Sequence, residues 1–334
     1  MDIKILKNLS DAVGIGHIKT ASQIAKEQLS KYAAAEDFGG IGIIARIDAD
    51  SDKTIMLEAH IDEVGFIVTH VFDDGFVKVA NIGGNDGRIL PAQPVVIHGK
   101  NDIPAVFAST PPHLSKDKTE ALQADEILLD TGVGCDAKNL ISPGDLITYE
   151  ADFKELTEGR VMGKSLDDRS GVFCLLEVAK RLKGRKLPCN VVFCLSEQEE
   201  LGTRGARTAS FAVNCDEAIA IDVTFGDAPD VPTLKSGKLG KGVMIGISPI
   251  LNRTITDKLI CLAKENKIPY QLEVMGGTTG TDADVISVAK DGIPCGLVSI
   301  PLRNMHTPTE IIDIGDIGSV CDILENYILS GGAL

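Results

Sequence analysis

The chain has 334 residues, of which 44% are hydrophobic and 24% charged, as is typical of a soluble globular protein with one large domain or two unequal ones. It carries 33 lysines and arginines against 48 aspartates and glutamates, which gives a formal net charge of −15. A surface this acidic repels nucleic acid and anionic membranes, so we expect neither as a partner.

Three features of the sequence predict a cytoplasmic location. The N-terminal segment MDIKILKNLSDAVGIGH has no apolar block of the kind that signal peptides carry. No apolar stretch reaches the roughly 18 residues that a membrane-spanning helix needs. The eight cysteines include no C-x-x-C pair and several lie in apolar runs, so we expect buried, reduced thiols.

The predicted elements change in character twice along the chain. Residues 18–33 have the apolar spacing of a helix, and 40–47 and 54–61 are predicted strands. Between about 65 and 157, short β-like pieces separated by glycine, proline and aspartate follow one another without a long helical pattern. Beyond 158 helices and strands alternate, with helices expected at 168–184, 254–267, 282–292 and from 314, and strands at 189–196, 217–223, 270–274 and 294–302.

This order of elements predicts an α/β fold. We expect residues 1–64 and 158–334 to form one domain, a mixed sheet with helices on both faces. An inserted β-rich, barrel-like domain of residues 65–157 would interrupt it.

Histidine, aspartate and glutamate recur where the predicted strands end. TIMLEAH delivers His60, followed by Asp62; VVFCLSEQ leads to Glu199 and Glu200; EAIAIDV delivers Asp222; GLVSIPLRN runs on to His306; and Asp167 and Asp168 open the helix that follows GKSL. Taken singly, each is more typical of a surface pair or a turn or helix cap. Sites of open α/β sheets form at the carboxyl ends of strands, so their recurrence there favours a metal site.

The residue types at these positions indicate which metals would bind. Imidazole and carboxylate ligands without thiolate suit Zn²⁺ or Co²⁺, and possible use of Mn²⁺ fits the same set. Two histidines with three or four acids are enough for two cations that share a carboxylate. The remaining histidines, His17, His70 and His98, lack an acidic partner at metal spacing and are interpreted as structural, while His113 keeps a substrate-side role as an alternative.

Long motifs in a fixed order make the chain resemble the tetrahedral or glutamyl aminopeptidases, a family of dinuclear-metal peptidases in which some members are labelled cellulase or endoglucanase. The motifs are EAHIDEVGFIV, IGGNDGRILPAQ, GKSLDDRSGV, SEQEELGTRGARTA, AIAIDVT, LGKG, GGTTGTDADVISVAKDGIP and RNMHTPTEIID, spanning at least residues 57–313. The resemblance implies an α/β peptidase core whose inserted β-domain mediates assembly into homo-oligomers, from dimers to tetrahedral dodecamers. Two segments depart from the family pattern, DAVGIGHIK and FGGIGII, and neither contains an expected ligand.

The resemblance also implies a role for each site residue. His60, Asp167, Glu200, Asp222 and His306 would bind two divalent ions, with Asp167 shared between them. Glu199 would act as the general base, and Asp62 would support catalysis by orienting the His60 ring. The peptide bond between Asp167 and Asp168 would be cis. The implied reaction removes the N-terminal residue from peptides with a free N-terminus, by means of a metal-activated bridging water.

Three other functions stay open at this point. One is a metal-dependent hydrolase acting on another amide or acyl substrate, and one is a glycan-acting enzyme, since glycosidases also use paired carboxylates. The lack of tryptophan and the 4% of aromatic residues disfavour sugar binding. The third is a non-catalytic metal-binding or assembly protein. Glu199 disfavours it, because this carboxylate is not needed as a metal ligand.

Overall fold

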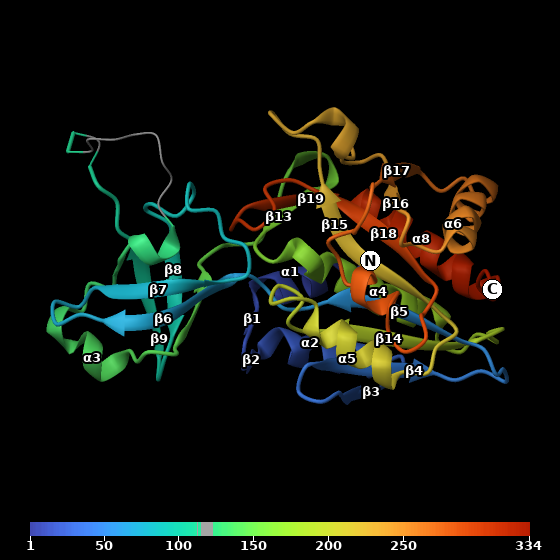
Figure 1. The fold of residues 1–334 in the computed structure, drawn as a ribbon, viewed down its shortest axis with the longest axis horizontal. Coiled ribbons are helices and arrows are strands. Elements are labelled where there is room, and N and C mark those ends of the chain that lie inside the picture. Colours follow the sequence, from blue (N-terminus) through green and yellow to red (C-terminus); the bar gives the residue numbers. More distant parts are fainter. Residues whose placement is uncertain (112, 115–122) are drawn as a thin grey trace.

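The computed structural model describes residues 1–111, 113–114 and 123–334. It has two parts that differ in architecture (Figure 1). The larger part is built on an eight-stranded mixed sheet. Its strands, in spatial order, are β17 (Tyr270–Val274), β16 (Val243–Ile247), β18 (Cys295–Leu302), β15 (Glu217–Phe225), β5 (Thr54–His60), β14 (Asn190–Ser196), β4 (Gly42–Ile47) and β3 (Ala34–Asp37). The central strands β18, β15, β5 and β14 are parallel, and β4 and β3 continue the sheet antiparallel.

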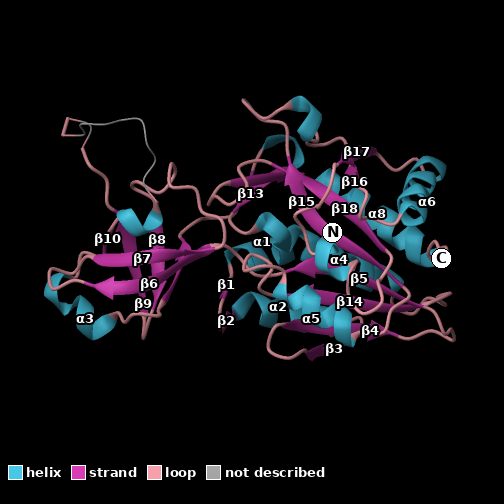
Figure 2. Ribbon diagram, in the orientation of Figure 1, coloured by secondary structure: helices cyan, strands magenta, loops and turns pink. Residues whose placement is uncertain are grey.

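Helices cover both faces of this sheet, which explains why every residue of β5 is buried. Alternate residues of β5 point to opposite faces, so Ile55 and Leu57 belong to one apolar core and Met56 to another. The first core contains residues of α1 (Ile3–Asp11), α2 (Thr20–Leu29), α4 (Leu166–Leu182), α6 (Arg253–Glu265) and α8 (Ile314–Leu329). The second contains residues of α5 (Arg204–Ala212) and α7 (Ala283–Ile286) (Figure 2).

The smaller part is a closed barrel that lies at one end of the molecule, to the left in Figure 1. In chain order its strands are β6 (Gly65–Val71), β7 (Val77–Ile82), β8 (Pro94–His98), β9 (Asp102–Phe107), β10 (Leu129–Asp130) and β11 (Leu146–Tyr149), with short helical turns at η1 (Ala124–Glu126), η2 (Gly134–Asp136) and α3 (Ala137–Leu140). The barrel has its own apolar core, in which the Phe66 ring meets Phe107 and Tyr149 edge-on at centroid distances of 4.9 and 5.5 Å.

Two small sheets complete the fold. In the first, β13 (Arg160–Gly163) pairs with β12 (Lys154–Glu155) on one side and β19 (Glu310–Asp313) on the other, so the chain leaving the barrel is tied to the segment after β18. The second joins β1 (Gly14–Ile15) to β2 (Ile18–Lys19). Short turns form η3 (Thr157–Gly159) and η4 (Thr233–Lys235). Within the described residues, no helix is both long and apolar enough to cross a membrane.

The predicted fold class is confirmed, and two helices are shorter than expected. The helix expected at 18–33 is α2, Thr20–Leu29. The helix expected at 282–292 ends at Ile286, and turns closed by hydrogen bonds from Ala289 N to Ile286 O and from Gly292 N to Ala289 O lead toward β18. Lys290 and Gly292 have left-handed φ angles of 56° and 102°, which a continuous helix does not accommodate.

Candidate metal centre

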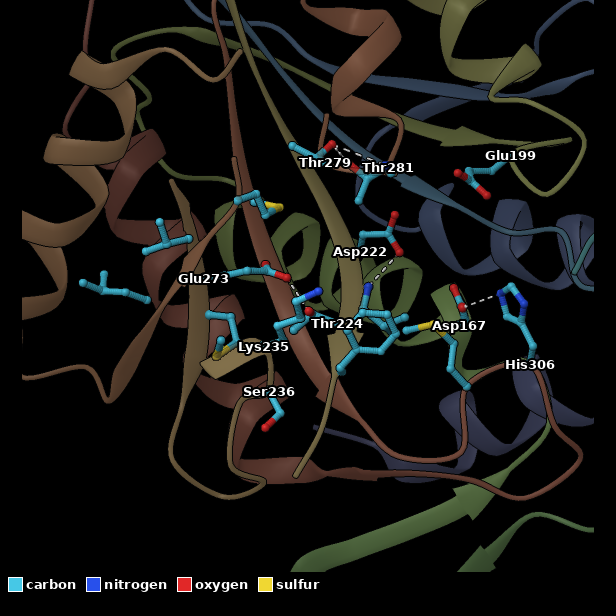
Figure 3. Close-up of a pocket in the computed structure, with 18 of the residues that line it drawn as sticks. Asp167, Glu199, Asp222, Thr224, Lys235, Ser236, Glu273, Thr279, Thr281 and His306 are labelled. Atoms are coloured by element: carbon cyan, nitrogen blue, oxygen red, sulfur yellow. Dashed lines mark hydrogen bonds and ion pairs between the residues drawn. The ribbon is translucent and has the colours of Figure 1, made fainter. Parts of the chain in front are cut away.

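The carboxyl ends of β15, β5 and β14 meet at one edge of the main sheet, because these three strands are parallel neighbours. His60 is the last residue of β5 and lies in register with Ser196, the last residue of β14. A cavity of about 590 Å³ opens at this edge, and Figure 3 shows labelled residues around it. Six residues expected from the sequence line it together: His60, Asp167, Glu199, Glu200, Asp222 and His306.

Asp167 lies between the two histidines, with one carboxylate oxygen toward each. Its Oδ1 is 3.0 Å from His60 Nε2, and its Oδ2 is 3.2 Å from His306 Nε2 (Figure 3 shows the second contact). A carboxylate that faces two imidazole nitrogens in this way has the geometry of a ligand shared by two cations.

The other two carboxylates expected as ligands, Glu200 and Asp222, lie near different histidines. Glu200 Oε1 lies 3.2 Å from His306 Nε2, and Asp222 Oδ1 lies 4.0 Å from His60 Nε2. Potential ligand atoms of His60, Asp167 and Asp222 all lie within 4.8 Å of one another, and the same holds for Asp167, Glu200 and His306. The site therefore consists of two three-residue groups that share Asp167.

Glu199 stands outside both of these groups, although it lies with His60 and Glu200 in a third group of the same compactness. Burial raises the pKa of Glu199 to about 8, and the negative charges of Asp282, Glu200 and Asp167 act in the same direction. Glu199 is therefore a further carboxylate on the cavity wall beside the two groups.

Asp62 lies behind the site rather than on the cavity wall, and it accepts hydrogen bonds from the backbone N–H groups of Glu199 (3.0 Å) and Glu200 (3.3 Å). Its Oδ1 is 3.5 Å from His60 Nδ1, longer than an ordinary hydrogen bond. Its firmest contacts are therefore with the segment after β14, which it holds against the end of β5.

The comparisons with known proteins agree on one family. Residues 40–323 match the M42 glutamyl aminopeptidase family. A lysyl aminopeptidase of Pyrococcus furiosus is 33% identical over 282 residues, covering 82% of this chain and 81% of its own length. The chain belongs to the M42 peptidases.

Solved structures of similar chains show the same fold. A TET aminopeptidase from a marine sediment archaeon of the Thaumarchaeota superposes with a TM-score of 0.94 at 28% identity, covering 99% of this chain and 96% of its own. The TET1 peptidase of Pyrococcus horikoshii, described as assembling into a tetrahedron or a large octahedral shell, has a TM-score of 0.87 at 26% identity over 98% of this chain and 99% of its own. A structure from Thermotoga maritima, described as an endoglucanase, has a TM-score of 0.78 at 27% identity over 98% and 97%.

M42 peptidases are metal-dependent hydrolases, and the electrostatics of this chain fit bound cations. Burial raises the pKa of Asp222 well above its ordinary value, and the neighbouring charge of Asp168 adds to the effect. Burial would lower the pKa of His306, but Asp167 and Glu200 outweigh it and raise that pKa to about 11. The carboxylates here repel one another. Cations bound by the two groups that share Asp167 would relieve this repulsion and would accept the lone pairs of the imidazole nitrogens.

Three residues adjoining or within this M42 site have backbone conformations that non-glycine residues seldom adopt. Ser165, Gln198 and His306 have φ angles of 57°, 63° and 60°, in the left-handed region. The peptide bond between Asp167 and Asp168 is cis, as the resemblance implied. The left-handed angles of Ser165, Gln198 and His306 are of the kind that clusters where the surrounding structure fixes functional side chains.

Glu310 is a part of the site that the sequence analysis did not identify. Its Oε2 accepts hydrogen bonds from the backbone N–H groups of Leu166 (2.7 Å) and Asp167 (3.2 Å), and its Oε1 accepts one from His306 (2.9 Å). One buried carboxylate thus fixes the backbone of two expected ligands. It stands inside the motif RNMHTPTEIID, but no spacing rule distinguishes it from a surface glutamate.

Glu63 is a second residue that the sequence analysis did not identify, and it holds together the segments that carry the ligands. Both of its oxygens are buried among donors from Gly14, Lys164, Ser165 and Arg169. Arg169, the last residue of the motif LDDR, is itself fully buried. This network ties the segment after β5 to the start of α4, which carries Asp167.

The remaining histidines stay outside the cavity. His17, His70 and His113 are exposed, and His98 contacts Asp102 (2.8 Å) and Thr148 (3.0 Å) within the barrel. His98 therefore does have an acidic neighbour, contrary to the sequence-based expectation, but not as part of a ligand group among the described residues.

Proposed function

We propose that this M42 peptidase is a dinuclear-metal aminopeptidase that removes the N-terminal residue from peptides. The observation that carries the proposal is the position of Asp167, whose two oxygens face His60 and His306 at 3.0 and 3.2 Å. A non-catalytic protein has no need of a further carboxylate beside two such groups, and Glu199 supplies one.

Bound cations would supply a water of lowered pKa and a Lewis acid for the scissile carbonyl. In this proposal His60, Asp167 and Asp222 hold one cation, and Asp167, Glu200 and His306 hold the other. Glu199 accepts the proton of the attacking water and returns it to the leaving amine. Asp62 acts indirectly, because it fixes the backbone of Glu199 and Glu200 and lies against the ring of His60.

A substrate and metal panel tests the reaction class. The protein is stripped with a chelator, reloaded with Zn²⁺, Co²⁺ or Mn²⁺, and offered chromogenic anilides of acidic, basic and apolar amino acids. We expect cleavage of at least one anilide that depends on added metal, and no cleavage of the same anilide carrying an N-acetyl group. Cleavage of cellulose-type substrates with no cleavage of any anilide would instead support the glycan-acting alternative.

The Glu199→Gln variant tests the assigned base. We expect it to bind the same number of metal ions as the wild type and to lose most of its turnover, on the scale of 10²–10⁴-fold that general acid–base catalysis contributes. Glu265→Gln, an exposed position on α6, is the matched control and should keep wild-type activity. Turnover close to wild type in metal-loaded Glu199→Gln would show that another group accepts the proton.

The structural relatives support a homo-oligomer, since the Pyrococcus horikoshii TET1 peptidase is described as a tetrahedral or octahedral assembly. We propose that residues 65–157, which contain the closed barrel, mediate assembly here, up to a tetrahedral dodecamer. Sedimentation velocity over a range of concentrations tests this, and a monomer throughout would contradict it. All eight cysteines are free, which suits the reducing cytoplasm as the proposed location.

A further inference from the structure

A turn that belongs to the barrel part of the chain lies against the metal centre. It follows β7 and contains Gly83 and Gly84, whose position in the sequence is far from every expected ligand. The carbonyl oxygen of Gly84 is 2.8 Å from His306 Nδ1, a contact between residues 222 positions apart. The barrel therefore contributes an atom that touches a ligand side chain directly.

This contact determines which way the His306 imidazole presents its nitrogens. A carbonyl oxygen can only accept a hydrogen bond, so Nδ1 must carry the proton that it donates to Gly84. Nε2 then faces Asp167 Oδ2 and Glu200 Oε1, both at 3.2 Å, and those oxygens are acceptors as well. Nε2 is protonated while it pairs with these two carboxylates, and a cation held by Asp167, Glu200 and His306 would take the place of that proton, with Nδ1 still fixed from behind by Gly84.

The two glycines leave room for the ligands. A side-chain carbon on Gly84 would lie 3.1 Å from His306 Nδ1, and one on Gly83 would lie 3.1 Å from Glu200 Oε2. Gly83 also has a φ of +71°, which other residues rarely adopt. A side-chain carbon on Gly83 would also meet Val64 Cγ1 at 2.8 Å, so this position requires glycine, whereas at Gly84 the His306 ring or the turn would have to shift by a few tenths of an ångström.

Asn85 connects this turn rigidly to the barrel. Its side-chain amide donates to the carbonyl oxygens of Gly65 (2.8 Å) and Ile82 (3.1 Å), and its Oδ1 accepts a hydrogen bond from the Tyr149 hydroxyl (3.0 Å). These partners come from the start of β6 and the ends of β7 and β11. The barrel position is thus transmitted through Asn85 to the turn and from there to His306.

We propose that the Gly83–Gly84 turn is a positioning element of the metal centre, through which the barrel sets the affinity of the cation held by Asp167, Glu200 and His306. The proposal rests on the metal centre of the proposed function, and it gives residues 65–157 a role at the site in addition to assembly. Because the contact is made to one ligand group only, the cation held by His60, Asp167 and Asp222 should be affected little.

Titration of the stripped protein with Zn²⁺, in competition with a chromophoric chelator, tests the proposal without using activity. The wild type should bind two ions per subunit. Gly84→Ala should weaken one of the two by about 10–100-fold, because the added carbon pushes the His306 ring away from its hydrogen bond to the carbonyl oxygen of residue 84, and leave the other within about twofold. Gly277→Ala is the control, because a side-chain carbon there meets nothing within 4 Å and its φ is not left-handed.

A double variant with His306→Ala distinguishes an effect on the position of His306 from general damage to the fold. His306→Ala should remove the same binding event, and Gly84→Ala added to it should leave the remaining ion unchanged. Equal weakening of both ions by Gly84→Ala, no weakening, or an undiminished effect in the His306→Ala background would overturn the proposal. Asn85→Ala provides an independent variant, with a smaller loss expected at the same ion. A wild type that binds no Zn²⁺ would refute the proposed function itself.

Discussion

Removal of the Glu63 charge should destabilise the protein strongly although Glu63 is not a ligand. Its carboxylate accepts hydrogen bonds from Gly14 N (2.9 Å), Arg169 Nη2 (2.9 Å) and Ser165 Oγ (2.6 Å), and it pairs with the ammonium of Lys164. Glu63→Gln would leave two buried cations without their counter-charge and place an amide N–H group among donors. Breaking a buried pair in this way typically costs about 3–5 kcal/mol.

The lowered pKa of Glu63 indicates an effect of the same size. Burial would raise it, but Arg169 and Lys164 outweigh burial and lower the pKa from 4.5 to about 2, which corresponds to about 3 kcal/mol. Burial lowers the pKa of Lys164 in spite of Glu63, so the pair also carries a desolvation cost. The value of about 3 kcal/mol therefore describes the loss of the Glu63 charge and not the net worth of the pair.

Urea unfolding followed by circular dichroism measures the difference. At pH 7 Glu63→Gln should unfold about 3 kcal/mol more easily than the wild type, while Asp257→Asn, which breaks an exposed pair with Arg253, should not differ measurably. A carboxylate whose pKa is lowered on folding stabilises above its unfolded pKa and loses that contribution as the pH falls. The gap between wild type and Glu63→Gln should therefore narrow between pH 4.5 and about 2. A variant as stable as the wild type at pH 7 would refute the reasoning.

Three further outcomes follow from the described contacts. Asp167→Asn should reduce bound zinc at both positions, because its two oxygens face different histidines, and elemental analysis of the dialysed protein measures this. Glu310→Ala should lower the free energy of unfolding by about 1–3 kcal/mol in a urea titration, because buried backbone donors of Leu166 and Asp167 lose their acceptor. A thiol reagent should react quickly with the exposed Cys135 and Cys261 in the native protein and with all eight cysteines only after unfolding; more than two or three fast thiols would contradict the described burial.

The sequence was sufficient to place most of the expected ligands, and the reason is the parallel arrangement of the central strands. In such a sheet the residues at the carboxyl ends of neighbouring strands meet at one edge, so His60, Glu200 and Asp222 are brought together once the strands are recognised. Asp167 also follows from local pattern, as the first of two acids at the start of a long helix. Which carboxylate binds and which moves a proton did not follow from the pattern and came from the resemblance.

Contacts between distant segments could not be predicted in the same way. The three backbone donors that Glu310 satisfies, and the Gly84 carbonyl behind His306, depend on how β19 and the turn after β7 are packed, and neither leaves a local pattern. By contrast, α1 did leave a signal that the sequence analysis passed over, because Asp2 caps its N-terminus by accepting from Lys4 N at 3.1 Å.

The two acids of the motif LDDR have different roles, so the motif alone could not distinguish a helix cap from a metal ligand. A pair of acids before a helix is more typical of a helix cap with a charge pair than of a metal ligand. Here Asp168 and Arg169 fit the first description and Asp167 fits the second. Asp168 accepts a hydrogen bond from Gly171 N at 3.0 Å, as a cap does, and Arg169 forms the charge pair, with the buried Glu63. Only Asp167 faces the histidines. Since capping uses one of the two acids, the structural role of the motif leaves the other carboxylate available to be a ligand, and the start of α4 holds it between His60 and His306.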